Sequence, residues 1–190
     1  MKEIIRKTKE TDIVCKLNIN GNGISKIDTG VGFLDHMLEA FAKHSGIDLE
    51  ISCKGDTYID DHHSVEDCGI VIGKALKDEI FPIKGVERYA NVTVVMDEAA
   101  STCAIDLSNR AYLVYQFDIF GKVGNFDVEL VEEFFKAVIS NSGITCHLIQ
   151  ERGKNKHHII EATFKSFAVA LRRALAKNEK IGIPSTKGVL

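Results

Sequence analysis

Hydrophobic side chains recur at helical spacing in two stretches of the chain. The first stretch lies between Gly32 and His44 and the second between Val128 and Asn141; their apolar positions are Phe33, Leu34, Met37, Leu38 and Phe41 in one, and Leu130, Val131, Phe134, Phe135 and Val138 in the other. Residues three and four positions apart share one face of a helix. Each stretch therefore predicts an amphipathic helix, and a glycine close behind it marks the expected end.

Two further helices and several strands are predicted around this pair. A second helix is expected after each adjacent pair of histidines, with apolar residues Ile70, Val71 and Leu76 on one and Phe164, Phe167, Val169 and Leu171 on the other. Runs rich in β-branched and aromatic residues predict strands over residues 13–19, 24–27, 89–96 and 111–118. Because Asn20-Gly21-Asn22-Gly23 separates the first two runs, we expect them to form a hairpin.

The chain also contains an internal repeat. Residues 45–51 correspond to residues 142–148, and each segment begins Ser-Gly-Ile, follows a predicted amphipathic helix and precedes a histidine pair. We therefore predict an α+β fold by internal duplication of a half-domain, with a mostly antiparallel four-stranded sheet and two helices in each half and the helices packed between the two sheets. Pro82 and Gly85 mark the seam, so residues 1–85 form the first half-repeat and residues 86–190 the second, together one domain.

Composition permits one substantial core and narrows the class of protein. The 190 residues are 45% hydrophobic, and their net charge of −3 argues against wholesale nucleic-acid binding. No apolar stretch is long enough to span a bilayer and no signal-peptide pattern follows Met1, so we expect a cytoplasmic protein without a membrane partner. The five cysteines lack C-x-x-C spacing and are expected to be reduced and buried.

Six of the seven histidines point to a specific chemistry. The motif His-His-x-x-Glu occurs twice, at His62, His63 and Glu66 and again at His157, His158 and Glu161. Positions i and i+4 share a helix face, so the first histidine of each motif can chelate a metal together with the glutamate. The second histidine then points toward another metal or the other motif. Because the same three residue types recur in the same context, we predict metal binding; imidazole and carboxylate without thiolate suit divalent manganese, iron or zinc.

Two isolated histidines extend this ligand set. His147 lies in a run of alternating character, where a strand would bury Ile144, Cys146 and Leu148 on one face and direct the imidazole out of the other. His36 lies on the first predicted helix among mostly apolar neighbours. Six histidines and two glutamates could give two six-coordinate ions four protein ligands each and leave positions open for substrate and water.

Segments along the whole chain resemble the imidazoleglycerol-phosphate dehydratase family of histidine biosynthesis. The similar segments are residues 8–11, 32–37, 55–56, 61–67, 96–99, 106–110, 157–165 and 184–188, in the family's order. The resemblance implies two manganese ions per subunit, held by His36, His62, His63, Glu66, His147, His157, His158 and Glu161. It also implies a shell of 24 identical subunits with active sites built between neighbours, an arrangement in which ligands from different subunits can meet.

The reaction implied by the resemblance removes water from D-erythro-imidazole glycerol phosphate and gives imidazole acetol phosphate. No carbonyl lies beside the carbon-bound proton that is lost, so the ring must supply the electrons: a dimanganese-bound imidazolate would expel the hydroxyl and give a diazafulvene-like intermediate. The catalytic centre would comprise the two His-His-x-x-Glu motifs together with Glu10, which matches a substrate-contacting position and which we expect to transfer a proton. The substrate phosphate would be bound by Arg88, Arg110, Lys165, Ser185 and Lys187.

Two alternatives of a different class accompany this hypothesis. A dinuclear metallohydrolase would attack a phosphate ester or amide with a metal-bridging hydroxide, and a metal-storage or metal-sensing shell would bind ions without leaving positions for substrate. A storage protein has no need of the expected phosphate-binding residues, and sensors more often use thiolates as well. The chain departs from the family at Asn109, where glycine is usual, and at Val95, where proline is common; both departures concern local turn or strand geometry.

Overall fold

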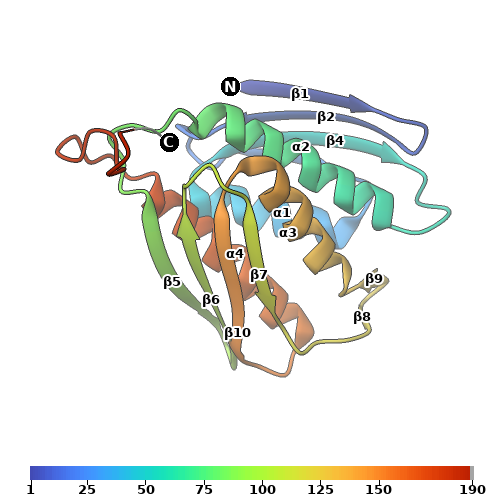
Figure 1. Ribbon diagram of the computed structural model, residues 1–190. Coiled ribbons are helices and arrows are strands. Elements are labelled where there is room, and N and C mark those ends of the chain that lie inside the picture. Colours follow the sequence, from blue (N-terminus) through green and yellow to red (C-terminus); the bar gives the residue numbers. More distant parts are fainter. Residues whose placement is uncertain (189–190) are drawn as a thin grey trace.

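Two four-stranded sheets enclose four helices in the structure, a computed structural model that describes residues 1–188 (Figure 1). The first half of the chain forms β1 (Lys2–Lys7), β2 (Thr11–Asn18), β3 (Ser25–Asp28), α1 (Gly32–Ser45), β4 (Asp48–Gly55) and α2 (His62–Ile80). The second half forms β5 (Tyr89–Met96), β6 (Ala99–Asp106), β7 (Tyr112–Gln116), β8 (Lys122–Val123), β9 (Phe126–Asp127), α3 (Leu130–Ser142), β10 (Thr145–Arg152) and α4 (Lys156–Ala174).

The two sheets have the same topology. Their strand orders are β1-β2-β4-β3 and β5-β6-β10-β7. In each sheet two pairings are antiparallel and the last, β3 with β4 or β7 with β10, is parallel. The matching order and pairing confirm the predicted α+β fold with a duplicated half-domain. The short β8–β9 hairpin is an addition to the second half.

The four helices lie where the apolar spacing predicts them. The helices α1 and α3 end at Gly46 and Gly143, whose φ angles of 75° and 73° place them in the left-handed region that favours glycine. The histidine pairs lie in the first turns of α2 and α4. None of the helices within residues 1–188 is both long and apolar enough to cross a membrane. The five cysteines are buried and free, as expected.

Helices from opposite halves pack against each other between the sheets. The helix α2 packs on α3, and α1 packs on α4 (Figure 1). Phenylalanines fill much of this core: Phe135 is fully buried, and its ring centroid lies 4.9 Å from that of Phe164 and 5.4 Å from that of Phe167. The two halves therefore share one hydrophobic core, which fixes the positions of the helix N-termini that carry the histidine motifs.

The predicted hairpin between residues 13–19 and 24–27 is wrong. The strands β2 and β3 do not pair; they lie on either side of β4, with β3 parallel to it. The Asp48 carboxylate explains the crossing, because its Oδ1 accepts hydrogen bonds from the backbone N–H groups of Asn22 (2.8 Å) and Ile24 (2.9 Å). Gly21 is required here for close approach, since a Cβ at this position would collide with Asp48. The glycine-rich segment is thus a crossover loop held by the start of β4.

Candidate functional site

Each His-His-x-x-Glu motif occupies the first turns of a helix, and the two copies have nearly the same geometry. Nε2 of His62 lies 3.7 Å from Oε2 of Glu66, and Nε2 of His157 lies 3.1 Å from Oε2 of Glu161, which confirms the shared helix face. The neighbouring rings diverge: His62 and His63 have centroids 6.3 Å apart at 80°, and His157 and His158 have centroids 6.3 Å apart at 79°. The second histidine of each motif therefore points away from the first.

The packing of α1 on α4 adds a third candidate ligand to the second motif. Nε2 of His36 lies 3.4 Å from Oε2 of Glu161. Within residues 1–188, His36, His157 and Glu161 form the one group of three or more metal-ligand side chains whose donor atoms all lie within 4.8 Å of one another. The Phe33 ring packs on His157 with a centroid distance of 5.2 Å and an interplanar angle of 77°. A side chain from the first half thus completes a cluster that belongs to the second.

Glu161 is suited to bind a cation because it stays ionised in a buried position. Its side chain is only 9% exposed, and Nζ of Lys165 lies 2.6 Å from its Oε1. Burial alone would raise the pKa of Glu161, but the hydrogen bond and charge of Lys165, together with His157 and His36, lower it below its usual value. Lys165 lies one turn along the same face of α4, as the sequence predicts, and it is paired with Glu161 rather than free.

A carboxylate holds the second histidine of each motif through Nδ1. Nδ1 of His63 lies 3.0 Å and 3.1 Å from the two carboxylate oxygens of Asp56, and Nδ1 of His158 lies 2.8 Å from Oε2 of Glu98. The hydrogen bonds that these two rings donate to Asp56 and Glu98 raise the pKa of His63 and of His158 above the usual value. The sequence analysis assigns these carboxylates no role. The one feature of the sequence that could have indicated them is their position in the family-like segments 55–56 and 96–99.

The remaining predicted ligands are not gathered with this cluster in a single chain. His62 and Glu66 are 42% and 47% exposed at the N-terminus of α2. His147 lies on the outward face of β10, in a hollow of about 460 Å³ that Asp106 and Thr145 also line. Its neighbours Cys146 and Leu148 are buried, which confirms the predicted alternation. A second hollow of about 570 Å³ is lined by both His36 and Asp61, the residue before His62. The N-termini of α1 and α2 therefore border the same hollow.

Glu10 lies in the turn between β1 and β2, close to the first motif. Its Oε1 is 3.8 Å from Nε2 of His63, and its side chain is 53% exposed. The Thr8 hydroxyl shapes the turn by accepting hydrogen bonds from the backbone N–H groups of Glu10 (3.1 Å) and Thr11 (3.0 Å). Thr11 in turn donates to the buried Asp67 on α2 at 2.5 Å. The turn is therefore anchored to the helix that carries His63, while the Glu10 carboxylate extends from it.

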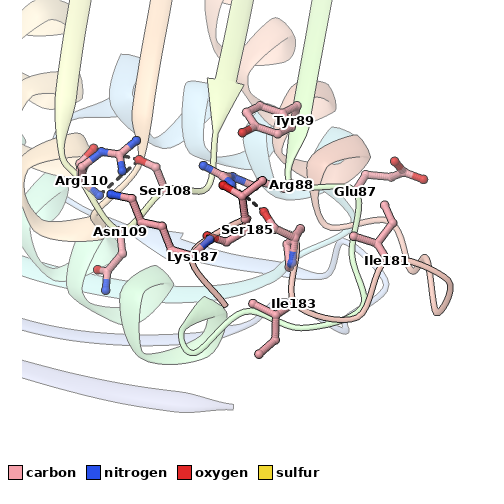
Figure 2. A pocket seen from close by; sticks show the side chains of 12 residues that line it. Glu87, Arg88, Tyr89, Ser108, Asn109, Arg110, Ile181, Ile183, Ser185 and Lys187 are labelled. Atoms are coloured by element: carbon pink, nitrogen blue, oxygen red, sulfur yellow. Dashed lines mark hydrogen bonds between the residues drawn. The ribbon is translucent and has the colours of Figure 1, made fainter. Parts of the chain in front are cut away.

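Four of the five expected phosphate-binding residues line one open hollow of about 940 Å³. Figure 2 shows Arg88, Arg110, Ser185 and Lys187 around it. The side chain of Arg110 is exposed, and within residues 1–188 its guanidinium makes no hydrogen bond, so its fork of donors is available to an anion. Lys165 does not line this hollow. Asn109 adopts a φ of 53°, in the left-handed region that favours glycine and that asparagine tolerates. The turn before Arg110 therefore forms in this chain although it lacks the usual glycine.

Arg88 has a largely structural place in this hollow. Its residue is 8% exposed; Nε lies 2.7 Å and Nη2 3.2 Å from the Asp106 carboxylate, and Nη1 donates to the Pro184 carbonyl at 2.6 Å. It therefore ties the C-terminal segment carrying Ser185 and Lys187 to the end of β6. In the part of the chain that the structure describes, two of its five N–H groups make no hydrogen bond and remain for a ligand.

We expect the Arg88→Ala variant to release this C-terminal segment. The substitution leaves the Asp106 carboxylate and the Pro184 carbonyl without their donor, at a cost on the order of 1–3 kcal/mol for each group that stays buried. Trypsin should then cut after Lys180 and Lys187 several-fold faster than in the parent, as followed by mass spectrometry. Arg110→Ala is the matched control, because its guanidinium makes no hydrogen bond to any of residues 1–188; equal cleavage in the two variants would contradict the prediction.

Comparisons with known proteins point to one family. The family model described as imidazoleglycerol-phosphate dehydratase matches residues 29–171. The imidazoleglycerol-phosphate dehydratase of Aliarcobacter butzleri is 72% identical over 190 residues and that of a Sulfurovum species 67% identical over 190 residues, each covering 100% of both chains. The crystal structure of the Staphylococcus aureus enzyme has a TM-score of 0.82 and 42% identity and covers 94% of this chain and 100% of its own. That of the Pyrococcus furiosus enzyme in complex with (S)-C348 has a TM-score of 0.85 and 37% identity, covering 98% and 100%.

Proposed function

Since the chain belongs to the imidazoleglycerol-phosphate dehydratase family and is a hydro-lyase of histidine biosynthesis, we propose that its His-His-x-x-Glu motifs make it a dimanganese enzyme. The substrate is D-erythro-imidazole glycerol phosphate and the products are imidazole acetol phosphate and water. The observation that carries the proposal is the convergence of His36, His157 and Glu161, whose donor atoms lie within 4.8 Å of one another. Family membership leaves no support for the hydrolase and storage alternatives.

The side chains present fit a divalent ion of intermediate hardness. Imidazole nitrogens and carboxylate oxygens, with the five cysteines buried elsewhere, form a donor set that suits manganese. The proposed ligands are His36, His62, His63, Glu66, His147, His157, His158 and Glu161. When bound, the metal would act as a Lewis acid that lowers the pKa of the substrate's imidazole ring. Glu161 supports this role because Lys165, His157 and His36 lower the pKa of its carboxyl below the usual value.

The chain's own residues would bind the substrate at its two ends and move its proton. Arg110 and Lys187, with help from Ser185 and the free N–H groups of Arg88, would bind the phosphate in the hollow shown in Figure 2. Glu10 would accept the carbon-bound proton that the substrate loses, because its exposed carboxylate extends from an anchored turn beside His63. The elimination has no neighbouring carbonyl to draw on, so a diazafulvene-like intermediate is the species expected once the hydroxyl leaves the substrate.

We propose that identical subunits complete the sites, in a shell of 24. Support comes from the ligands that one chain leaves apart: His147 lies on the outward face of β10, and His62 and Glu66 are half exposed. Lys165 likewise lies away from the hollow that holds the other phosphate-binding residues. A symmetric assembly can bring such separated side chains together at subunit boundaries. The cytoplasmic location stays a prediction.

The test is turnover by protein that has been stripped of metal and then titrated with manganese. We expect no formation of imidazole acetol phosphate after chelation and recovery of activity near two ions per subunit. Light scattering on the same samples should show a smaller particle without metal, because ligands at subunit boundaries couple metal binding to assembly. Full activity in the stripped protein would contradict the metal proposal, and an unchanged large particle would contradict the coupling.

A further inference from the structure

Two glutamates occupy equivalent places in the duplicated fold. Glu10 directly precedes β2, and Glu98 directly precedes β6. The strands β2 and β6 correspond because both are second in their sheets and both pair with the strand that follows α1 or α3, in registers that match Asn18 with Asp48 and Asp106 with Thr145. Each glutamate therefore lies in a hairpin turn next to the second histidine of a motif.

Both carboxylate oxygens of Glu98 accept hydrogen bonds. Its Oε2 lies 2.8 Å from Nδ1 of His158, and its Oε1 accepts the backbone N–H groups of Asn155 (2.8 Å) and Lys154 (3.2 Å). Asn155 is the N-cap of α4, where its side chain accepts the N–H groups of His157 and His158. The hydrogen bonds from His158 and from these backbone groups lower the pKa of Glu98 to about 2. The glutamate is thus built into the helix N-terminus that presents the second motif.

Within residues 1–188 the Glu10 carboxylate makes no such hydrogen bond, because another carboxylate binds the second histidine in the first half. Asp56, whose side chain is 11% exposed, lies 3.0 Å from Nδ1 of His63. Its backbone N–H donates to the Glu10 carbonyl at 3.1 Å, so the loop after β4 supports the turn that carries Glu10. The Glu10 carboxylate itself is 3.8 Å from the other ring nitrogen, Nε2. Each half therefore binds Nδ1 of its second histidine with a carboxylate, but the carboxylate comes from the loop after β4 in the first half and from the turn before β6 in the second.

We propose that Asp56 and Glu98 are positioning residues that fix His63 and His158 with Nε2 directed to metal, which leaves Glu10 as the glutamate of the pair available for proton transfer. An ionised carboxylate only accepts hydrogen bonds, so Nδ1 must carry the proton and the lone pair of the neutral ring must lie on Nε2. Carboxylates that hold a metal-binding imidazole in this way typically contribute 10–100-fold to metal affinity. This inference rests on the manganese proposal above.

The experiment is a manganese titration of stripped protein, with free Mn²⁺ measured by electron paramagnetic resonance. We expect Asp56→Ala and Glu98→Ala each to weaken binding at one ion per subunit by roughly 10–100-fold. Asp56→Asn and Glu98→Gln keep an acceptor oxygen and nearly the same shape, so they should restore part of the affinity and also exclude a failure to fold. Asp78→Ala and Glu179→Ala remove exposed carboxylates that contact no histidine in residues 1–188 and should bind as the parent does.

A double-substitution cycle separates positioning from a general effect of charge. In a His63→Ala background, Asp56→Ala should cause no further loss of manganese affinity, because Asp56 acts through that ring. The inference is overturned if Asp56→Ala weakens binding equally with and without His63, or if both single variants bind as tightly as the parent. Failure of the parent itself to bind Mn²⁺ would instead overturn the manganese proposal, and the titration of unmodified protein reveals that case before any variant is made.

Discussion

The Glu10→Gln variant will lose roughly 10²–10⁴-fold in kcat, the contribution typical of a group that transfers a proton in the transition state. Glutamine keeps the shape of the side chain but cannot take up a proton. The fold should not change, because the turn depends on the backbone N–H groups of Glu10 and Thr11 and on the Thr8 hydroxyl, not on the Glu10 carboxylate. Steady-state turnover of imidazole glycerol phosphate measures the loss.

The matched comparison is Glu98→Gln, the same substitution at the equivalent turn. It should weaken manganese binding, and its kcat at saturating manganese should stay close to that of the parent. Glu10→Gln should show the opposite pattern, with manganese affinity unchanged within about twofold, since Glu10 Oε1 lies 3.8 Å from Nε2 of His63, too far for a hydrogen bond that would orient the ring. Equal losses of kcat in both variants at saturating metal would show that Glu10 has no special part in proton transfer.

The Gly73→Ala variant will be less stable than the parent although alanine is the better helix former. A Cβ at position 73 of α2 would lie 2.5 Å from the Val138 carbonyl oxygen and 2.9 Å from Cβ of Asn141, both on α3. Overpacking of this kind costs about 1–3 kcal/mol, whereas the gain in helix propensity is at most about 1 kcal/mol. The obstacle is main chain, which can move only if the two helices separate. A lowered midpoint of thermal unfolding, measured by calorimetry, is the expected result.

Gly32→Ala is the control for this prediction. Gly32 also lies in a helix, at the start of α1, but a Cβ there would meet nothing within 4 Å and its φ is not positive. The same chemical change should therefore be neutral or slightly stabilising. A Gly73→Ala protein that melts with the parent would mean that α2 and α3 separate without cost, which would contradict the close packing seen at Gly73.

The helices and the repeat can be predicted from the sequence because both depend on local spacing. Apolar residues three and four positions apart determine α1 and α3, and their C-terminal glycines adopt the left-handed conformation expected of them. Strand pairing depends on contacts distant in sequence. The loop between β2 and β3 has the composition of a tight turn, but the Asp48 carboxylate holds it open, and Asp48 lies in a different strand. Nothing in residues 20–23 alone distinguishes the two outcomes.

Much of the candidate site follows from spacing within one helix, and the rest does not. The pairs His62 with Glu66 and His157 with Glu161 are four residues apart, so the sequence is sufficient to place them together. The approach of His36 to Glu161 requires α1 to pack on α4. The hydrogen bond between Glu98 and His158 requires the turn between β5 and β6 to lie against the N-terminus of α4. These contacts join segments far apart in sequence, where periodicity carries no information.

The packing of helices across the two halves has a consequence for how such a chain can arise. Interchanging the halves turns the α2–α3 contact into the α4–α1 contact, so the arrangement has an approximate twofold axis, and a half-length ancestor would be a homodimer using the same surfaces. In such a dimer the two His-His-x-x-Glu motifs would have identical surroundings by symmetry. His36 lies ten residues before Gly46, the glycine that ends α1, and Glu133 lies ten residues before Gly143, the glycine that ends α3. Glu133 therefore occupies the position in α3 that His36 occupies in α1, and it forms an ion pair with Lys136 at 2.9 Å instead. Fusion of two such copies would free these positions to differ, so one chain could carry two unequal sites where identical subunits could carry only two equal ones.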